Sequence, residues 1–191
     1  MKYEKVLKFL EIVGSTFIII SIIELAYIVI LNFTPFILDG NILMLSEFVY
    51  SSTIFPFSGT LLWLFVIISM VCFLILGIFI FKISSKKKIE SSALAKLIII
   101  IGMVALLAGL VKMDFLVLLG KTKITSTFTT IRFQSALYSP TITSYSAALF
   151  WIFFLSVNTF YLLLGLCITA VGIKWSLLQE EAEKQEKNVK D

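Results

Sequence analysis

The sequence predicts an all-α integral membrane protein built as a four-transmembrane-helix bundle with both termini in the cytoplasm. Three observations lead to this fold class. Hydrophobic residues make up 59% of the chain and charged residues only 15%, which is far from the composition of a soluble domain. Four apolar runs are each long enough to cross a bilayer, and lysines gather on alternate segments between them.

The four predicted spans lie at about 10–32, 60–81, 93–119 and 147–174. Each reaches or exceeds the roughly 20 residues that cross a hydrocarbon core. The first run follows lysines, as a secretory signal does, but it is too long and no small-residue cleavage site follows it. We therefore expect one transmembrane domain over 1–175 and a charged helical tail over 176–191.

The orientation follows from the basic residues, because positive charge near a span resists translocation. The N-terminus, the middle loop and the tail lie on one side of the membrane in this prediction. The two loops near 33–59 and 120–146 lie on the other side. The basic residues of the first side are Lys2, Lys5, Lys8, Lys82, Lys86, Lys87, Lys88, Lys96, Lys174, Lys184, Lys187 and Lys190, against Lys121, Lys123 and Arg132 on the second. This imbalance predicts a multi-pass protein of the cell membrane with the N-terminus and the C-terminus in the cytoplasm.

The middle loop contains Lys86, Lys87 and Lys88 in succession. These lysines serve as a topology signal, and the same cluster is suited to binding anionic lipid headgroups. A nucleic-acid partner is not expected, because the net charge of +4 is spread over termini and loops rather than over one folded face.

Charged residues also lie inside the predicted spans, where charge is costly. Glu24 is eight residues before Asn32, and Lys112 is seven residues before Leu119, so both lie about 10–12 Å below the same surface at 1.5 Å per residue. We predict that they form an ion pair, with Asp114 on roughly the opposite helix face. The alternative is that the third span ends near Val111, which would leave Lys112 and Asp114 at the headgroup level.

Further polar residues approach the same depth, namely Ser69 in the second span and Asn158 in the fourth. Hydrogen bonds between helices explain such a layer, and we favour this explanation. A transport pathway is the alternative, although no chain of ionisable groups leads from Glu24 to the cytoplasm.

Small residues recur in the third and fourth spans. They are Ala95, Gly102, Ala105, Ala108 and Gly109 in one, and Gly165, Thr169 and Gly172 in the other. Small side chains let helix backbones approach closely. We expect this contact within the monomer, with a homodimer face as the less favoured use.

The two outer loops are rich in residues that favour strands, and Asp39-Gly40 stands between apolar runs as a hairpin turn does. We expect a small external β element formed from these loops. The alternative places 42–50 as a short interfacial helix, with Ser46 and Glu47 facing water. Phe48, Tyr50, Phe55, Phe57 and Trp63 fit an aromatic belt at the outer interface.

This order of four spans, with both ends inside, resembles the topology of claudin-like and tetraspanin-like proteins. The resemblance is confined to topology, since neither outer loop contains a cysteine. It therefore assigns no role to any residue of this chain.

The sequence contains no histidine, no CxxC pair and no phosphate-binding glycine loop, so no catalytic, metal or cofactor motif is recognisable. We expect a non-enzymatic protein without a cofactor, an accessory or scaffold subunit. It would bind other membrane proteins, or further copies of itself, through its outer loops and small-residue helix faces. The alternative is a small transporter or channel that uses Glu24 with Lys112 or Asn158.

Overall fold

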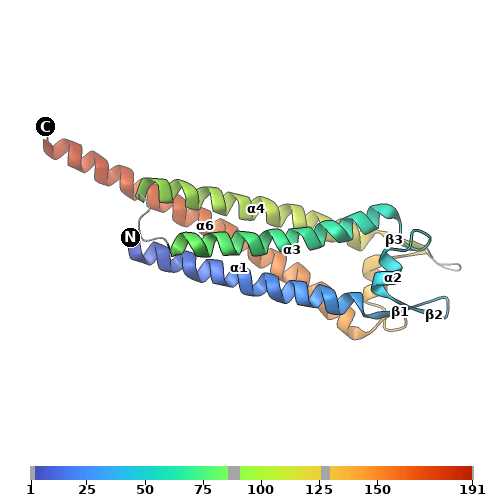
Figure 1. Cartoon of the computed structure of the whole chain (residues 1–191). Coiled ribbons are helices and arrows are strands. Elements are labelled where there is room, and N and C mark those ends of the chain that lie inside the picture. Colours follow the sequence, from blue (N-terminus) through green and yellow to red (C-terminus); the bar gives the residue numbers. More distant parts are fainter. Residues whose placement is uncertain (1–2, 86–90, 126–129, 191) are drawn as a thin grey trace. The chain divides into compact units, whose positions relative to one another are not determined.

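The computed structural model describes residues 3–85, 91–125 and 130–190, and most of them are helical (Figure 1). Four helices are long and apolar enough to cross a membrane: α1 (Tyr3–Asn32), α3 (Phe57–Ser84), α4 (Ser91–Lys121) and α6 (Tyr145–Lys190). The four predicted apolar spans fall within these helices. The prediction of a mostly helical chain with four such helices is therefore confirmed.

All three prolines of the chain lie outside the four long helices. Pro35 begins strand β1 (Pro35–Leu38), Pro56 directly precedes α3, and Pro140 lies in the segment before α6. Proline lacks an N–H donor and breaks a helix interior. The long helices are therefore free of proline, and the connections between them contain all three.

The chain divides into two compact units, which are described separately. The first unit, here called the terminal unit, comprises Met1–Ile19, Phe73–Gly109 and Phe160–Asp191. The second, here called the hairpin unit, comprises Ile20–Cys72 and Leu110–Thr159. Each of the four long helices contributes one segment to each unit.

The terminal unit is held by two close helix contacts. A Cβ atom on Gly102 of α4 would lie 2.5 Å from the backbone nitrogen of Thr169 in α6, and one on Gly165 would lie 2.9 Å from that of Leu106. In the same way, Gly14 of α1 lies against Phe81 and Gly77 of α3. The expected close helix contact within the monomer is confirmed. The pairing of the two small-residue faces with each other, and the contact between α1 and α3, were not predicted from the sequence.

Aromatic rings also pack inside the terminal unit. Phe73 of α3 and Tyr161 of α6 stack with ring centroids 4.0 Å apart, and Phe17 of α1 stacks on Tyr161 at 5.2 Å. All three side chains are buried. Stacked rings of this kind add to the area-based stabilisation of an apolar core.

The hairpin unit contains two antiparallel hairpins. β1 pairs with β2 (Asn41–Met44), and β3 (Lys123–Thr125) pairs with β4 (Thr130–Arg132). Asp39 and Gly40 have φ values of 52° and 78°, as a two-residue hairpin turn of type I′ requires. The prediction of a hairpin at Asp39-Gly40 is confirmed.

The two loops that contain these hairpins are tied together. Ile37 donates its backbone N–H to the carbonyl of Ile142 at 2.7 Å, and Thr143 donates its hydroxyl to the carbonyl of Pro35. Thr125 likewise donates its backbone N–H to the carbonyl of Ile54. We call the combined structure the hairpin cap, comprising 33–56, 122–125 and 130–144.

A short helix, α2 (Leu45–Val49), follows β2. Glu47 accepts the backbone N–H of Met44 at 2.9 Å, which caps the first turn. The alternative of a helix over 42–50 is therefore right only for this turn, because Ile42 belongs to β2. A second short helix, α5 (Phe133–Leu137), follows β4.

The core of the hairpin unit contains a cluster of aromatic rings among aliphatic side chains. Phe133 contacts Phe55, Trp63 and Trp151, with ring centroids 5.5–6.3 Å apart. Phe48 of α2 stacks on Phe36 of β1 at 5.5 Å. These rings fix the cap to α3 and α6.

This core corrects the expected aromatic belt. Phe48, Phe55 and Trp63 are buried rather than placed at an interface, while Tyr50 and Phe57 are exposed. Aromatic side chains contribute strongly to the stability of a protein core, and the cap supplies such a core.

Candidate functional site

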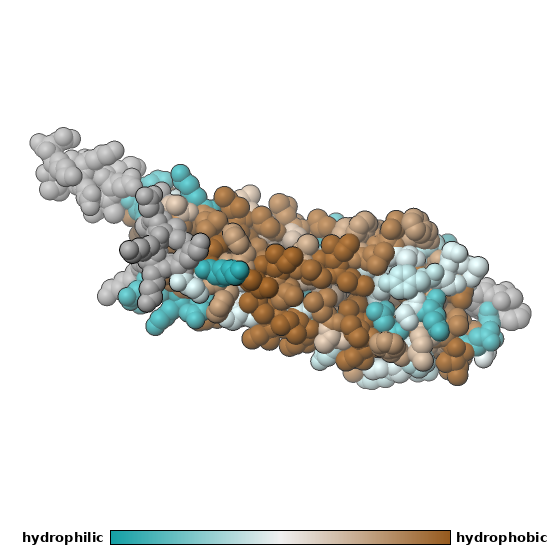
Figure 2. Space-filling model, in the orientation of Figure 1, coloured by the Kyte–Doolittle hydropathy of each residue, from teal (hydrophilic) through white to brown (hydrophobic). Residues whose placement is uncertain are grey.

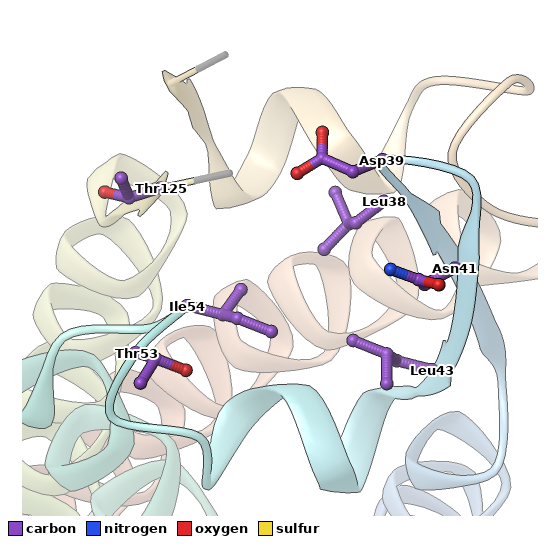
Figure 3. Close-up of a pocket in the computed structure, with 7 residues that line it drawn as sticks. All are labelled: Leu38, Asp39, Asn41, Leu43, Thr53, Ile54 and Thr125. Atoms are coloured by element: carbon purple, nitrogen blue, oxygen red, sulfur yellow. The ribbon is translucent and has the colours of Figure 1, made fainter. Parts of the chain in front are cut away.

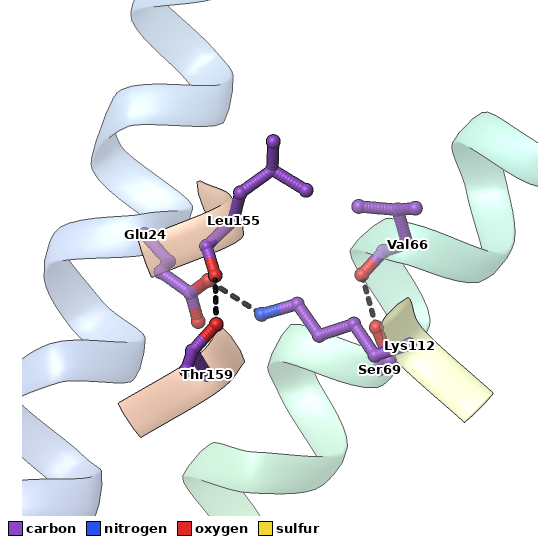
Figure 4. Close-up of polar contacts among 6 residues, drawn as sticks. All are labelled: Glu24, Val66, Ser69, Lys112, Leu155 and Thr159. Atoms are coloured by element: carbon purple, nitrogen blue, oxygen red, sulfur yellow. Dashed lines mark hydrogen bonds and ion pairs between the residues drawn. The ribbon is translucent and has the colours of Figure 1, made fainter. Parts of the chain in front are cut away.

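The buried ion pair is the central polar feature of the hairpin unit. Lys112 of α4 donates a hydrogen bond from Nζ to Oε1 of Glu24 on α1 at 2.5 Å (Figure 4). Both side chains have 0% of their surface exposed. The predicted pairing is present, and it joins two helices that are far apart in the sequence.

Figure 4 also shows two hydroxyl groups, on α3 and α6. Ser69 of α3 donates to the carbonyl of Val66 at 2.6 Å, and Thr159 of α6 donates to the carbonyl of Leu155 at 3.1 Å. Both hydroxyls are therefore engaged by the backbone of their own helix. Ser69, which the sequence placed in a polar layer, is partly buried at this position.

Asn158 and Ser21 complete the buried polar residues of the helices in this unit. Both side chains are fully buried. Asn158 was expected at this depth, whereas Ser21 was not singled out from the sequence. The signal that could have found it is spacing, because Ser21 precedes Glu24 by three residues and so shares its helix face.

Asp114 does not join this cluster. Its side chain is exposed, while Lys112, two residues earlier, is fully buried. The prediction that the two residues lie on opposite faces of the helix is confirmed.

The arrangement favours a structural role for the pair. Two charges removed from water are costly unless they contact each other directly and are otherwise hydrogen-bonded. Glu24 and Lys112 neutralise each other, and their contact fixes the rotation and the axial position of α1 relative to α4 within this unit. As it stands, the pair has no exposed atom that could receive an ion from water.

A groove of about 390 Å³ opens in the hairpin cap (Figure 3). Side chains from the first hairpin, from the segment before α3 and from β3 line it. They are Leu38, Asp39, Asn41, Leu43, Thr53, Ile54 and Thr125. The lining combines apolar side chains with amide, hydroxyl and carboxylate groups.

The lysines at 86, 87 and 88 lie outside the described residues. Their suggested binding of lipid headgroups stays a prediction from the sequence. Comparisons of the chain with protein-family models, with curated proteins and with solved structures found no match.

Proposed function

We propose that this chain is a non-enzymatic, multi-pass protein of the cell membrane that serves as an accessory or scaffold subunit for another membrane protein. Both termini lie in the cytoplasm in this proposal, and the hairpin cap lies outside. The lysine distribution supports the orientation. The exposed apolar surface of the helices, seen in Figure 2, supports the membrane location.

One observation carries the binding role. Ile37 and Ile42 stand directly opposite each other in the first hairpin, and 48% and 69% of their surfaces are exposed. Met44 of β2 and Tyr50, which follows α2, are also exposed. A cluster of large apolar side chains on a hydrogen-bonded, outward-facing hairpin is typical of a protein-binding surface.

The small-residue faces, which were expected from the sequence to bind partners as well, are not used in this proposal. Gly102, Gly165 and Gly172 are closed off by backbone atoms of the neighbouring helix in the same chain. The partner contacts are therefore assigned to the hairpin cap and to exposed helix surface.

Co-purification in mild detergent tests the proposal. The tagged chain should bring a second membrane protein with it from native membranes, and Ile42→Asp should release that protein. Asn41→Asp is the matched control, because it adds the same charge at the adjacent position, which lines the groove instead. A chain that purifies alone, from membranes in which it is abundant, would contradict the accessory role.

A transporter or channel is the second candidate. It is supported by the gathering of Ser21, Glu24, Lys112 and Asn158, from three helices, in the interior of one unit. In this case Glu24→Gln would abolish an ion flux in reconstituted vesicles while leaving thermal stability nearly unchanged. Loss of stability, with no flux in the parent protein, would favour the accessory role.

A further inference from the structure

We propose that the face of α4 around Asp114 binds a transmembrane helix of another protein, and that this helix carries a lysine or arginine at the depth of Asp114. The inference rests on the proposed accessory function and names the chemistry of its partner. It concerns a surface separate from the hairpin cap.

Asp114 stands in the middle of an apolar surface. The residues three and four positions away on either side share its helix face, and all four are exposed: Leu110, Val111, Val117 and Leu118. Among the described residues, Asp114 has no ion pair and no hydrogen bond of its side chain. The neighbouring cation, Lys112, is buried and bound to Glu24.

The packing of α3 shows how deep Asp114 lies. Phe115, the next residue, stacks on Phe65 of α3 with ring centroids 5.2 Å apart. From Phe65, α3 continues for eight residues to its first residue, Phe57, which is exposed. At 1.5 Å per residue, the apolar surface of α3 extends about 12 Å beyond this level.

The exposed residues of α1 independently indicate the same depth for Asp114. Glu24 is level with Lys112 because the two side chains touch. Beyond Glu24, α1 still exposes Val29 and Ile30, which lie five and six residues further along the helix, about 8–9 Å. A headgroup level at Asp114 would place these side chains in water, so the carboxylate belongs within the apolar band.

A bare carboxylate in this band is costly, and a basic side chain on a facing helix removes that cost. In a second copy of this chain, the described residues of the hairpin unit provide no exposed basic side chain at this depth, since Lys112 is buried. In a parallel pair, Asp114 would face Asp114, and the nearest exposed lysine on α4, Lys121, lies seven residues or about 10 Å away. The partner is therefore a different membrane protein.

Synthetic transmembrane peptides test this inference directly. The full chain, labelled at its C-terminal end, is reconstituted in vesicles with a labelled peptide of about 23 leucine and alanine residues. The peptide carries one lysine at the matching depth, and matched peptides carry leucine or glutamate instead. We expect the lysine peptide to associate about 3-fold to 20-fold more tightly than the leucine peptide, measured by energy transfer.

Variants at the same position make the test specific. Asp114→Asn should remove the preference for lysine, and Asp114→Lys should transfer it to the glutamate peptide. Glu11→Gln is the control. It removes an exposed carboxylate from a different helix, α1, and should leave the preference for the lysine peptide unchanged. Equal association of the lysine and leucine peptides, or a preference that survives Asp114→Asn, would overturn the inference. Energy transfer between copies of the chain that depends on Asp114 would overturn it as well.

A depth measurement tests the premise. A cysteine at position 114, in a chain with Cys72 and Cys167 replaced, is labelled and quenched with lipids that carry the quencher at known depths. The label should lie about 10 Å deeper than one at position 121, and equal depths would refute the placement. The proposed function is judged separately: a native partner that co-purifies equally well with Asp114→Asn would retain the accessory role and exclude this helix face.

Discussion

Lys112 and Glu24 are 88 positions apart in the sequence, yet their side chains meet at 2.5 Å with no exposed surface on either. The contact closes the interior of the hairpin unit around a neutral pair. Removing either side chain would therefore leave the charge of the other buried without this partner.

The pair should show strong coupling in a double-mutant cycle. Glu24→Gln or Lys112→Met alone leaves a buried charge without its partner and should cost about 3–5 kcal/mol in the free energy of unfolding. The double variant should recover much of this loss, because no charge remains buried. Thermal unfolding in detergent is measured for the parent protein, for each single variant and for the double variant.

Ser69→Ala is the control for this cycle. The hydroxyl of Ser69 is bonded to its own helix, so its loss should cost less than about 1 kcal/mol. Additive effects of Glu24→Gln and Lys112→Met would contradict a direct energetic coupling.

The contact between α4 and α6 should not tolerate a methyl group at Gly102. Its Cβ would meet backbone atoms of Thr169, so the helices must move apart, at a cost of about 1–3 kcal/mol. Val104→Leu, on the exposed side of the same helix, should be nearly neutral. Denaturation of both variants in the same detergent compares them, and equal stabilities would refute the close approach.

The first hairpin should depend on glycine at position 40. Gly40→Val places a β-branched residue at a φ of 78° and should cost about 1–2 kcal/mol. Gly40→Asn should be tolerated much better, because asparagine adopts this backbone conformation more readily. Hydrogen exchange of the Ile37 amide, which is bonded to Ile142, reports on the hairpin directly. Unchanged protection in Gly40→Val would show that the turn does not hold it.

The proposed orientation predicts one-sided labelling. In a chain with Cys72 and Cys167 replaced, a cysteine at position 132 should react with an impermeant reagent from outside, and one at position 181 only after the membrane is opened. Labelling of position 181 from outside would show that the C-terminal tail is not cytoplasmic and would contradict the proposed orientation.

The sequence predicted the ion pair because depth in a helix can be counted from its ends. It also separated Lys112 from Asp114, since residues two apart point away from each other on a helix. It did not reveal the contact of Gly14 with Gly77. Single glycines carry no periodic signal, and the rotation of α1 against α3 is fixed only by the folded unit.

The aromatic residues show a different limit of prediction from the sequence. Phe48, Phe55 and Trp63 precede or begin a span, as interfacial aromatics do. Their burial depends on Phe133, which is distant in the sequence and contacts Phe48, Phe55 and Trp63. Composition around one span cannot anticipate such a partner, whereas the turn at Asp39-Gly40 was predictable because its cause is local.

The hydrogen bond from Ile37 to Ile142 also sets an order of events during synthesis. About 105 residues must be added after Ile37 before its partner exists, which takes roughly 5–20 s at the usual rate of about 5–20 residues per second. During this interval β1 presents an open strand edge, and open edges pair with other chains. A ribosome that stalls before residue 142 would therefore leave a nascent chain whose first hairpin has an unpaired edge, able to pair with other chains. Uninterrupted translation through the second loop would shorten this exposure and so reduce aggregation.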